Sequence, residues 1–195
     1  MNAIVMAGGC GTRMKSKKEK LLLDIDGEAM IIRTVRILSD SQLFDSISCI
    51  TSANAPETAT ILENAKIQTI STAGLGYSKD LGEALSHMCG HVLIVSGDMP
   101  LLDSHILQRM IKLYDKNSIW TSFVMTRKFA NTLDIEYHHV FGKFDYVHTG
   151  VMIVNASAYE GENKFVKEDH IILDEKKLGI NINTLQDYEN LISFT

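Results

Sequence analysis

The chain has 195 residues, a formal net charge of −5, 45% hydrophobic residues and 22% charged residues, which is ordinary for one globular domain. The acidic balance argues against a nucleic-acid partner, because nucleic-acid binders are usually basic. Three cysteines without a C-x-x-C pair argue against a disulfide framework and a cysteine zinc site, and favour a reducing, cytoplasmic compartment. No apolar run approaches the ~20 residues of a transmembrane helix, so we expect a soluble protein. Its oligomeric state is expected to be a monomer or a homodimer.

Short apolar runs alternate with amphipathic ones through the first half of the chain. Strands are predicted over residues 2–7, 46–51, 66–70 and 91–96, and helices over residues 30–38, 57–65, 78–88 and 104–114. This alternation predicts an α/β fold of the Rossmann-like kind, a mostly parallel sheet with helices on both faces.

The second half is less regular. Strands are predicted over residues 120–125 and 147–154, and a loop or hairpin over residues 129–144, inside a β-rich excursion between Phe129 and Asp174. A terminal helix is predicted over residues 184–191, with Thr184 as its cap. Because no domain boundary is evident, residues 1–195 are predicted to form a single domain.

A glycine-rich loop, AGGCGTRM, follows the first predicted strand at residues 7–14. Its three glycines let the backbone turn tightly and bring N–H groups close to phosphates. Arg13 can bind phosphate oxygens through its forked guanidinium, and Lys20 can add a point charge to the same anion. The spacing is neither that of a Walker loop nor that of a dinucleotide-binding loop, so the pattern predicts a different phosphate site.

Asp98 follows the apolar strand of residues 91–96 within the stretch VSGDMP. The carboxyl ends of parallel strands form the ligand-binding edge of such sheets, so Asp98 and the glycine loop are expected to meet there. A carboxylate at that edge suits Mg²⁺, which takes oxygen ligands from one or two carboxylates and from substrate phosphates. The alternative is that Asp98 caps the helix near Ser104 or forms an Asx-turn.

Two further stretches carry polar or glycine-rich patterns. Asn181 and Asn183 lie two apart on an extended segment and therefore point to the same side, where they can bind metal or phosphate, unless one of them caps the last helix. Residues 72–81 form a glycine-rich turn that runs into a helix, whose N-terminus can hold an anion or a base edge. A simple loop with a helix cap explains this second pattern equally well.

These motifs together resemble the sugar-phosphate and cofactor nucleotidyltransferases of the molybdopterin-guanylyltransferase-like superfamily. The resemblance rests on the glycine loop, Glu19-Lys20, Gly97-Asp98 and Asn181-x-Asn183-Thr184. Within that group the chain resembles the archaeal GTP:adenosylcobinamide-phosphate guanylyltransferases, in the stretch Gly74-x-Gly76-Tyr77-x-x-Asp80-Leu81, a Thr149-Gly150-Val151 turn and the ending from Asp174 to Thr184. The chain departs from the pattern at Leu21, where the family commonly has proline, and carries Cys10 at the variable loop position.

The resemblance implies transfer of GMP from GTP to adenosylcobinamide phosphate, a phosphorylated corrinoid, with release of pyrophosphate. It assigns catalytic roles to Arg13, Lys20 and Asp98, with Asp98 as the Mg²⁺ ligand. The nucleotide-binding residues that it implies are Ala7, Gly8, Gly9, Gly11, Thr12, Ser52, Asn54, Thr72, Gly76, Gly150, Asn181 and Asn183. The attacking phosphate is already anionic, so none of the seven histidines is needed as a general base.

Two alternatives remain open. The first is a related nucleotidyltransferase with another acceptor, such as molybdopterin or a sugar phosphate. The second is a nucleotide-sensing module that binds a triphosphate without releasing pyrophosphate; the presence of Arg13, Lys20 and Asp98 together argues against it. The side chains do not indicate which base is selected.

Overall fold

The computed structural model describes residues 1–9, 11, 18–133, 140–141, 145–161, 164–182, 187–189 and 191. The strands are β1 (Asn2–Met6), β2 (Asp24–Ile25), β3 (Glu28–Ala29), β4 (Ile47–Ser52), β5 (Gln68–Thr72), β6 (His91–Ser96), β7 (Trp120–Thr126), β8 (Val140–Phe141), β9 (Tyr146–Asn155) and β10 (Glu168–Ile172). The helices are α1 (Met30–Asp40), α2 (Pro56–Asn64), α3 (Tyr77–Leu85), α4 (Ser104–Leu113), α5 (Arg127–Thr132) and α6 (Lys176–Gly179), with a 3₁₀ turn η2 (Lys20–Leu22).

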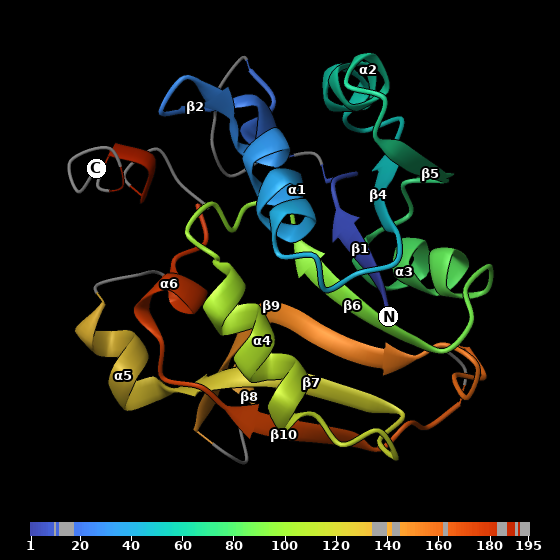
Figure 1. Cartoon of the computed structure of the whole chain (residues 1–195), viewed down its shortest axis with the longest axis vertical. Helices are drawn as coiled ribbons and strands as arrows, with labels where there is room; N and C mark the ends of the chain where they lie inside the picture. The colour runs from blue at the N-terminus through green and yellow to red at the C-terminus, as the bar shows by residue number, and fades with distance from the viewer. Residues whose placement is uncertain are drawn as a thin grey trace.

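The main sheet has eight strands, in the order β10-β7-β9-β6-β1-β4-β5, with β8 beside β9 (Figure 1). Neighbouring strands run parallel in the pairs β1–β4, β1–β6, β4–β5 and β7–β10. Strand β9 runs antiparallel to β6, β7 and β8. The mostly parallel sheet predicted from the alternating pattern is therefore confirmed, and the carboxyl ends of β1, β4, β5 and β6 share one edge.

Helices cover both faces of this sheet. Successive residues of a strand point to opposite faces, so Val5 enters a core shared with α1, α2 and α4, whereas Ile4 enters a core shared with α3. Figure 1 shows α1 and α4 on the side of the sheet nearer the viewer. Every residue of β6 between its first and last is buried, as expected for a strand covered on both faces.

The segment predicted as a loop or hairpin begins instead as a helix. Residues 127–132 form α5, and the Thr126 hydroxyl caps it by accepting a hydrogen bond from the Phe129 N–H at 3.1 Å. A helix of six residues is too short to display a clear apolar period, so the sequence pattern does not distinguish it from a loop. Residues 134–139 and 142–144 of the predicted hairpin lie outside the described part of the chain.

The predicted turn at Thr149-Gly150-Val151 is a β-bulge inside the continuous strand β9. Phe123 of β7 pairs with Val151 but the next residue, Val124, pairs with His148, which leaves Thr149 and Gly150 extra. Gly150 has a φ of 86°, which favours glycine. The bulge brings Gly150 beside Ser96, at the end of β6.

The end of the chain returns to the β2–β3 hairpin. The Tyr188 hydroxyl donates a hydrogen bond to the Asp24 carbonyl at 2.6 Å, and Leu191 is buried in the same core as α1. Residues 187–189 are helical, but Thr184 and its predicted cap lie outside the described residues. Among the described helices, no stretch is long and apolar enough to cross a membrane.

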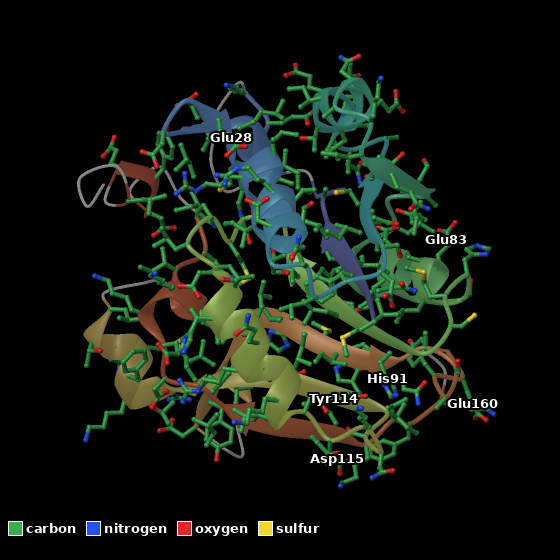
Figure 2. All side chains as sticks on the ribbon, viewed as in Figure 1. Glu28, Glu83, His91, Tyr114, Asp115 and Glu160 are labelled. Atoms are coloured by element: carbon green, nitrogen blue, oxygen red, sulfur yellow. The ribbon has the colours of Figure 1, made fainter. Side chains whose placement is uncertain are left out.

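His91 lies at the amino end of β6. Its Nδ1 atom is hydrogen-bonded to the hydroxyl of Tyr114, the residue that follows α4 (Figure 2). Partial burial, Lys116 and the N-terminal amine lower the pKa of His91 below its ordinary value of 6.5. Below that pH the unfolded chain binds a proton that folded His91 resists, so the free energy of unfolding should fall as the pH drops through 6.5 and level off below the folded pKa.

The decrease in the free energy of unfolding at low pH is expected to be smaller in His91→Gln, because the titrating group is removed. Urea denaturation of both proteins between about pH 7.5 and about pH 5 measures the difference across the range in which histidine titrates. Parallel curves for the two proteins would exclude His91 as the source of the pH dependence.

Candidate functional site

A cavity of about 600 Å³ opens at the carboxyl ends of β1, β4 and β6. Its lining residues are Met6, Gly8, Gly9, Gly11, Lys20, Leu21, Ile50, Asn54, Gly74, Leu75, Gly76, Tyr77, Asp80, Ser96 and Asp98. The volume is in the range of small-molecule sites. The cavity thus brings the glycine loop, Lys20 and Asp98 together, as the strand directions require.

Two glycines of the loop, Gly8 and Gly11, pack closely against neighbouring residues. The Gly8 carbonyl accepts a hydrogen bond from the Ser52 hydroxyl at 2.7 Å, and a Cβ added at Gly8 would lie 3.1 Å from Ser52. Gly11 has a φ of 57°, and a Cβ there would lie 3.0 Å from Lys20 Cβ. Side chains at these two positions would push the loop away from Ser52 and Lys20, so glycine keeps the backbone N–H groups beside the cavity.

Lys20 and Asp98 form an ion pair within this cavity. Lys20 Nζ lies 2.5 Å from Asp98 Oδ2, and the two side chains are only 12% and 9% exposed. The other carboxylate oxygen, Asp98 Oδ1, is buried and accepts no hydrogen bond from any described residue. A buried carboxylate oxygen without a donor is costly in the absence of a ligand, which marks this atom as a candidate ligand position.

The loop that carries Asp98 is held by its neighbours. The Gly97 N–H donates to the Met6 carbonyl at 3.1 Å, and a Cβ at Gly97 would lie 2.9 Å from that oxygen, so this glycine is required by close packing against β1. From α1, Thr34 Oγ1 donates to the Gly97 carbonyl at 3.2 Å and Arg33 Nε donates to the Pro100 carbonyl at 3.0 Å. Asp98 does not cap α4, because Asp103 does.

Asn181 lies next to this loop. Its Nδ2 donates to the Thr149 carbonyl at 3.2 Å, and the N–H of Ile182 donates to the Asp98 carbonyl at 3.2 Å. Asn181 Oδ1 is a second buried oxygen with no hydrogen-bond donor in the described part of the chain. Carboxylate and amide oxygens are the ligand types that Mg²⁺ prefers, so Asp98 Oδ1 and Asn181 Oδ1 are candidate ligands of a divalent cation.

The loops after β4 and β5 are tied together on the other side of the glycine loop. Asn54 Nδ2 donates to the Gly74 carbonyl at 2.9 Å, and the Asn54 N–H donates to the Ser52 hydroxyl at 3.1 Å. The Thr72 hydroxyl donates to the Thr51 carbonyl at 3.1 Å, and Thr72 is buried outside the cavity lining. Asn54 and Gly76 therefore border the cavity, whereas Ser52 and Thr72 lie behind it.

Ala7 and Gly150, two further residues predicted to bind the nucleotide, lie in the described part of the chain. Ala7 is fully buried behind the glycine loop, and its N–H donates to the Ile50 carbonyl at 2.8 Å. Gly150 lies beside Asn181, because a Cβ added at Gly150 would be 3.2 Å from the Nδ2 atom of Asn181. Thr12, Arg13 and Asn183 lie outside the described residues.

The structure also brings two residues to the cavity for which the sequence suggested no individual role. Asp80 Oδ1 accepts hydrogen bonds from the N–H groups of Gly74 and Leu75 at 2.9 and 3.2 Å. Burial of the Tyr77 hydroxyl and the nearby Asp98 carboxylate raise the pKa of Tyr77 above its ordinary value, although 46% of the residue is exposed. The glycine pattern around both residues was the available signal, but it did not indicate what these side chains contact.

Glu19 is a third residue for which the sequence suggested no individual role, although it does not line the cavity. Its two carboxylate oxygens accept hydrogen bonds from the N–H groups of Glu57 and Thr58, each at 2.8 Å. These N–H groups belong to the first turn of α2, where a negative charge is favourable. Glu19 thus joins the segment that carries Lys20 to a helix far away in the sequence.

Glu19→Ala is expected to lower the free energy of unfolding by about 1 kcal/mol, the usual effect of losing a helix cap. It should also raise the KM for the nucleoside triphosphate, because Lys20 is the next residue. Chemical denaturation and steady-state kinetics measure the two effects. Glu57→Ala, which removes an exposed acidic side chain from the same turn of α2, is the control; equal effects of both substitutions would contradict a specific role of Glu19.

Solved structures of nucleotidyltransferases share this architecture. A nucleotidyl transferase from Methanothermobacter thermautotrophicus has a TM-score of 0.72 at 19% identity, covering 99% of this chain and 96% of that one. A hypothetical transferase from Thermus thermophilus has a TM-score of 0.71 at 15% identity, covering 96% of this chain and 99% of that one. At such identities the likeness establishes the fold.

Sequence comparison establishes the family. The model of the MobA-like NTP transferase domain matches residues 3–135. The chain is 32% identical over 198 aligned residues to the adenosylcobinamide-phosphate guanylyltransferase of Methanocaldococcus jannaschii, covering 96% of this chain and 93% of that protein. It is also 33% identical to the bifunctional protein GlmU of Staphylococcus saprophyticus, but over 60% of this chain and 26% of that protein. The chain therefore belongs to the MobA-like NTP transferase family and is a nucleotidyltransferase.

Proposed function

We propose that the protein transfers GMP from GTP to adenosylcobinamide phosphate and releases pyrophosphate. The observation that carries the reaction class is the buried Lys20–Asp98 pair at the glycine-loop end of the cavity. The choice of GTP as donor and of the corrinoid as acceptor rests on the name of the M. jannaschii relative. This chain matches 93% of the length of that relative.

In this proposal the cavity binds the triphosphate through backbone N–H groups and positively charged side chains. The N–H groups of Gly8, Gly9 and Gly11 face the phosphates, and Arg13 and Lys20 neutralise them. The acceptor phosphate attacks the α-phosphorus in line, and pyrophosphate leaves. Because the acceptor is already an anion, catalysis consists of positioning and charge stabilisation without a general base.

Asp98 is the proposed ligand of Mg²⁺, and Asn181 or Asn183 completes the ligand set. The buried oxygens Asp98 Oδ1 and Asn181 Oδ1, which have no hydrogen-bond partner in the described part of the chain, support this assignment. A Mg²⁺ ion held there would supply a Lewis acid for phosphoryl chemistry. Asp98 Oδ2 accepts a hydrogen bond from Lys20 Nζ, and we propose that Lys20 leaves Asp98 for a phosphate oxygen when substrate binds.

The wider assignments follow from the same proposal. The partners are GTP and a phosphorylated corrinoid, without nucleic acid, and the enzyme acts in the cytoplasm, as expected for an acidic chain without a paired cysteine framework. Residues 1–195 act as one domain, either as a monomer or as a homodimer.

The test is pyrophosphate release with Mg²⁺ and each of GTP, ATP, CTP and UTP, without an acceptor and with adenosylcobinamide phosphate, molybdopterin or a sugar phosphate as the acceptor. Release confined to GTP with adenosylcobinamide phosphate is the expected result. Release with molybdopterin or a sugar phosphate, and not with the corrinoid, would replace the proposed acceptor. Triphosphate binding without release for any of these acceptors would point to a sensing module instead.

A further inference from the structure

Asp80 is a buried carboxylate at the part of the cavity that is formed by the β5–α3 loop. The residue is 7% exposed and lines the cavity. Its Oδ1 is occupied by the N–H groups of Gly74 and Leu75. Its second oxygen, Oδ2, has no hydrogen-bond donor among the residues that the structure describes, so it is available to a ligand in the cavity.

Apolar side chains flank this carboxylate at the same cavity. Leu75 is 66% exposed and Tyr77 is 46% exposed, although both line the cavity. Gly74 and Gly76, with φ values of 70° and 114°, place Leu75 at the tip of the loop. Exposed apolar groups beside one buried acceptor form a surface suited to a flat, partly apolar ring with hydrogen-bond donors along one edge.

Among the nucleobases, guanine carries such an edge. A carboxylate accepts hydrogen bonds but donates none, and guanine presents its N1–H and its 2-amino group side by side. Adenine presents an acceptor at N1, and uracil flanks its single N–H with two carbonyl oxygens, so both would place lone pairs against Asp80. We propose that Asp80 is the residue that selects guanine, with Oδ2 accepting from the base edge while Oδ1 holds the loop. This inference rests on the proposed use of GTP.

The test compares nucleotide binding to the full chain in the presence of Mg²⁺ and without an acceptor. Isothermal titration gives Kd values for GTP, for inosine triphosphate, which lacks the 2-amino group, and for xanthosine triphosphate, which has a carbonyl in its place. The wild-type protein is expected to bind GTP about tenfold tighter than either analogue, the effect of one hydrogen bond to a charged group.

Asp80→Asn should reverse the preference. Its amide oxygen can still accept from Gly74 and Leu75, while its NH₂ group replaces Oδ2 and matches the xanthine carbonyl. We expect GTP to bind about tenfold more weakly and xanthosine triphosphate about tenfold more tightly than to the wild type. Inorganic tripolyphosphate should bind both proteins equally, because the phosphate end of the cavity is unchanged.

Glu83→Gln is the matched control. Glu83 lies one turn further along α3 (Figure 2), accepts a hydrogen bond from the Ala73 N–H at 3.4 Å, and does not line the cavity. It should leave the ratio of the two Kd values unchanged. A ratio altered as much by Glu83→Gln as by Asp80→Asn would overturn the proposal.

Two other outcomes would also overturn it. One is an unchanged ratio in Asp80→Asn, and the other is a parallel loss of GTP, xanthosine triphosphate and tripolyphosphate binding, which would make Asp80 a support of the loop alone. If Asp80→Asn does not fold, equal wild-type affinities for GTP and inosine triphosphate would still refute the proposal. Wild-type GTP selectivity without an Asp80 effect leaves the proposed function standing, whereas tighter binding of ATP or a pyrimidine nucleotide refutes the proposed donor itself.

Discussion

Asp98→Asn is expected to lower kcat for pyrophosphate release by at least about a thousandfold, the scale of a contribution of several kcal/mol from a metal ligand. The substitution keeps the shape of the side chain and replaces one carboxylate oxygen by an NH₂ group. It therefore removes the negative charge that faces Lys20 and the proposed cation. Single-turnover assays with GTP and the corrinoid acceptor at saturating Mg²⁺ measure the loss.

The same substitution leaves the buried Lys20 ammonium without its counter-charge, so the free energy of unfolding should fall by about 1–3 kcal/mol. Circular dichroism should nevertheless show the folded protein. Asp103→Asn is the matched control, because Asp103 caps α4 and pairs with Lys177 at 2.9 Å, outside the cavity. Near-normal turnover in Asp98→Asn, or an equal loss in Asp103→Asn, would show that Asp98 does not hold the metal.

Lys20→Met is expected to produce opposite effects on catalysis and on cation binding. Turnover should fall about 10²–10³-fold, as is typical when a group that stabilises transition-state charge is removed. In contrast, binding of Mn²⁺ alone, without nucleotide, should tighten roughly tenfold, because the ammonium 2.5 Å from Asp98 Oδ2 no longer competes for the carboxylate. Manganese titration followed by electron paramagnetic resonance measures the second effect.

A matched substitution elsewhere separates this effect from net charge. Lys112→Met removes an exposed lysine from α4, away from the cavity, and should change neither turnover nor Mn²⁺ affinity. Weaker or unchanged Mn²⁺ binding in Lys20→Met would mean that the Lys20–Asp98 pair does not occupy the cation site. Full turnover in Lys20→Met would remove Lys20 from the proposed mechanism.

Much of the fold was predictable because its signals are local. The fully apolar run of β6, the helical spacing of α1 and the cap of α4 each depend on residues a few positions apart. The prediction failed where an element was too short or was shaped by its neighbour. Helix α5 spans six residues, and the bulge at Gly150 appears only as a register shift between β9 and its neighbour β7.

The residues of the candidate site were also only partly recognisable from the sequence. The glycine loop and Asp98 were recognisable from residue type and from their positions after apolar strands, since parallel strands end at one edge. Glu19 and Asp80 belong to motifs of the family resemblance, but the sequence did not indicate what their side chains contact. Their importance depends on which backbone N–H groups they meet, and those belong to α2 and to the β5–α3 loop.

By itself, the sequence determined the kind of fold, the phosphate-binding character of the first loop and the family, because periodicity, glycine placement and motif spacing are properties of short segments. Tertiary structure alone decided that Lys20 and Asp98, 78 residues apart, form one buried pair. It also decided that Ile182, at the other end of the chain, closes on the Asp98 carbonyl. The strand order and crossover connections create these contacts, and no local pattern specifies which distant side chains they bring within hydrogen-bonding reach.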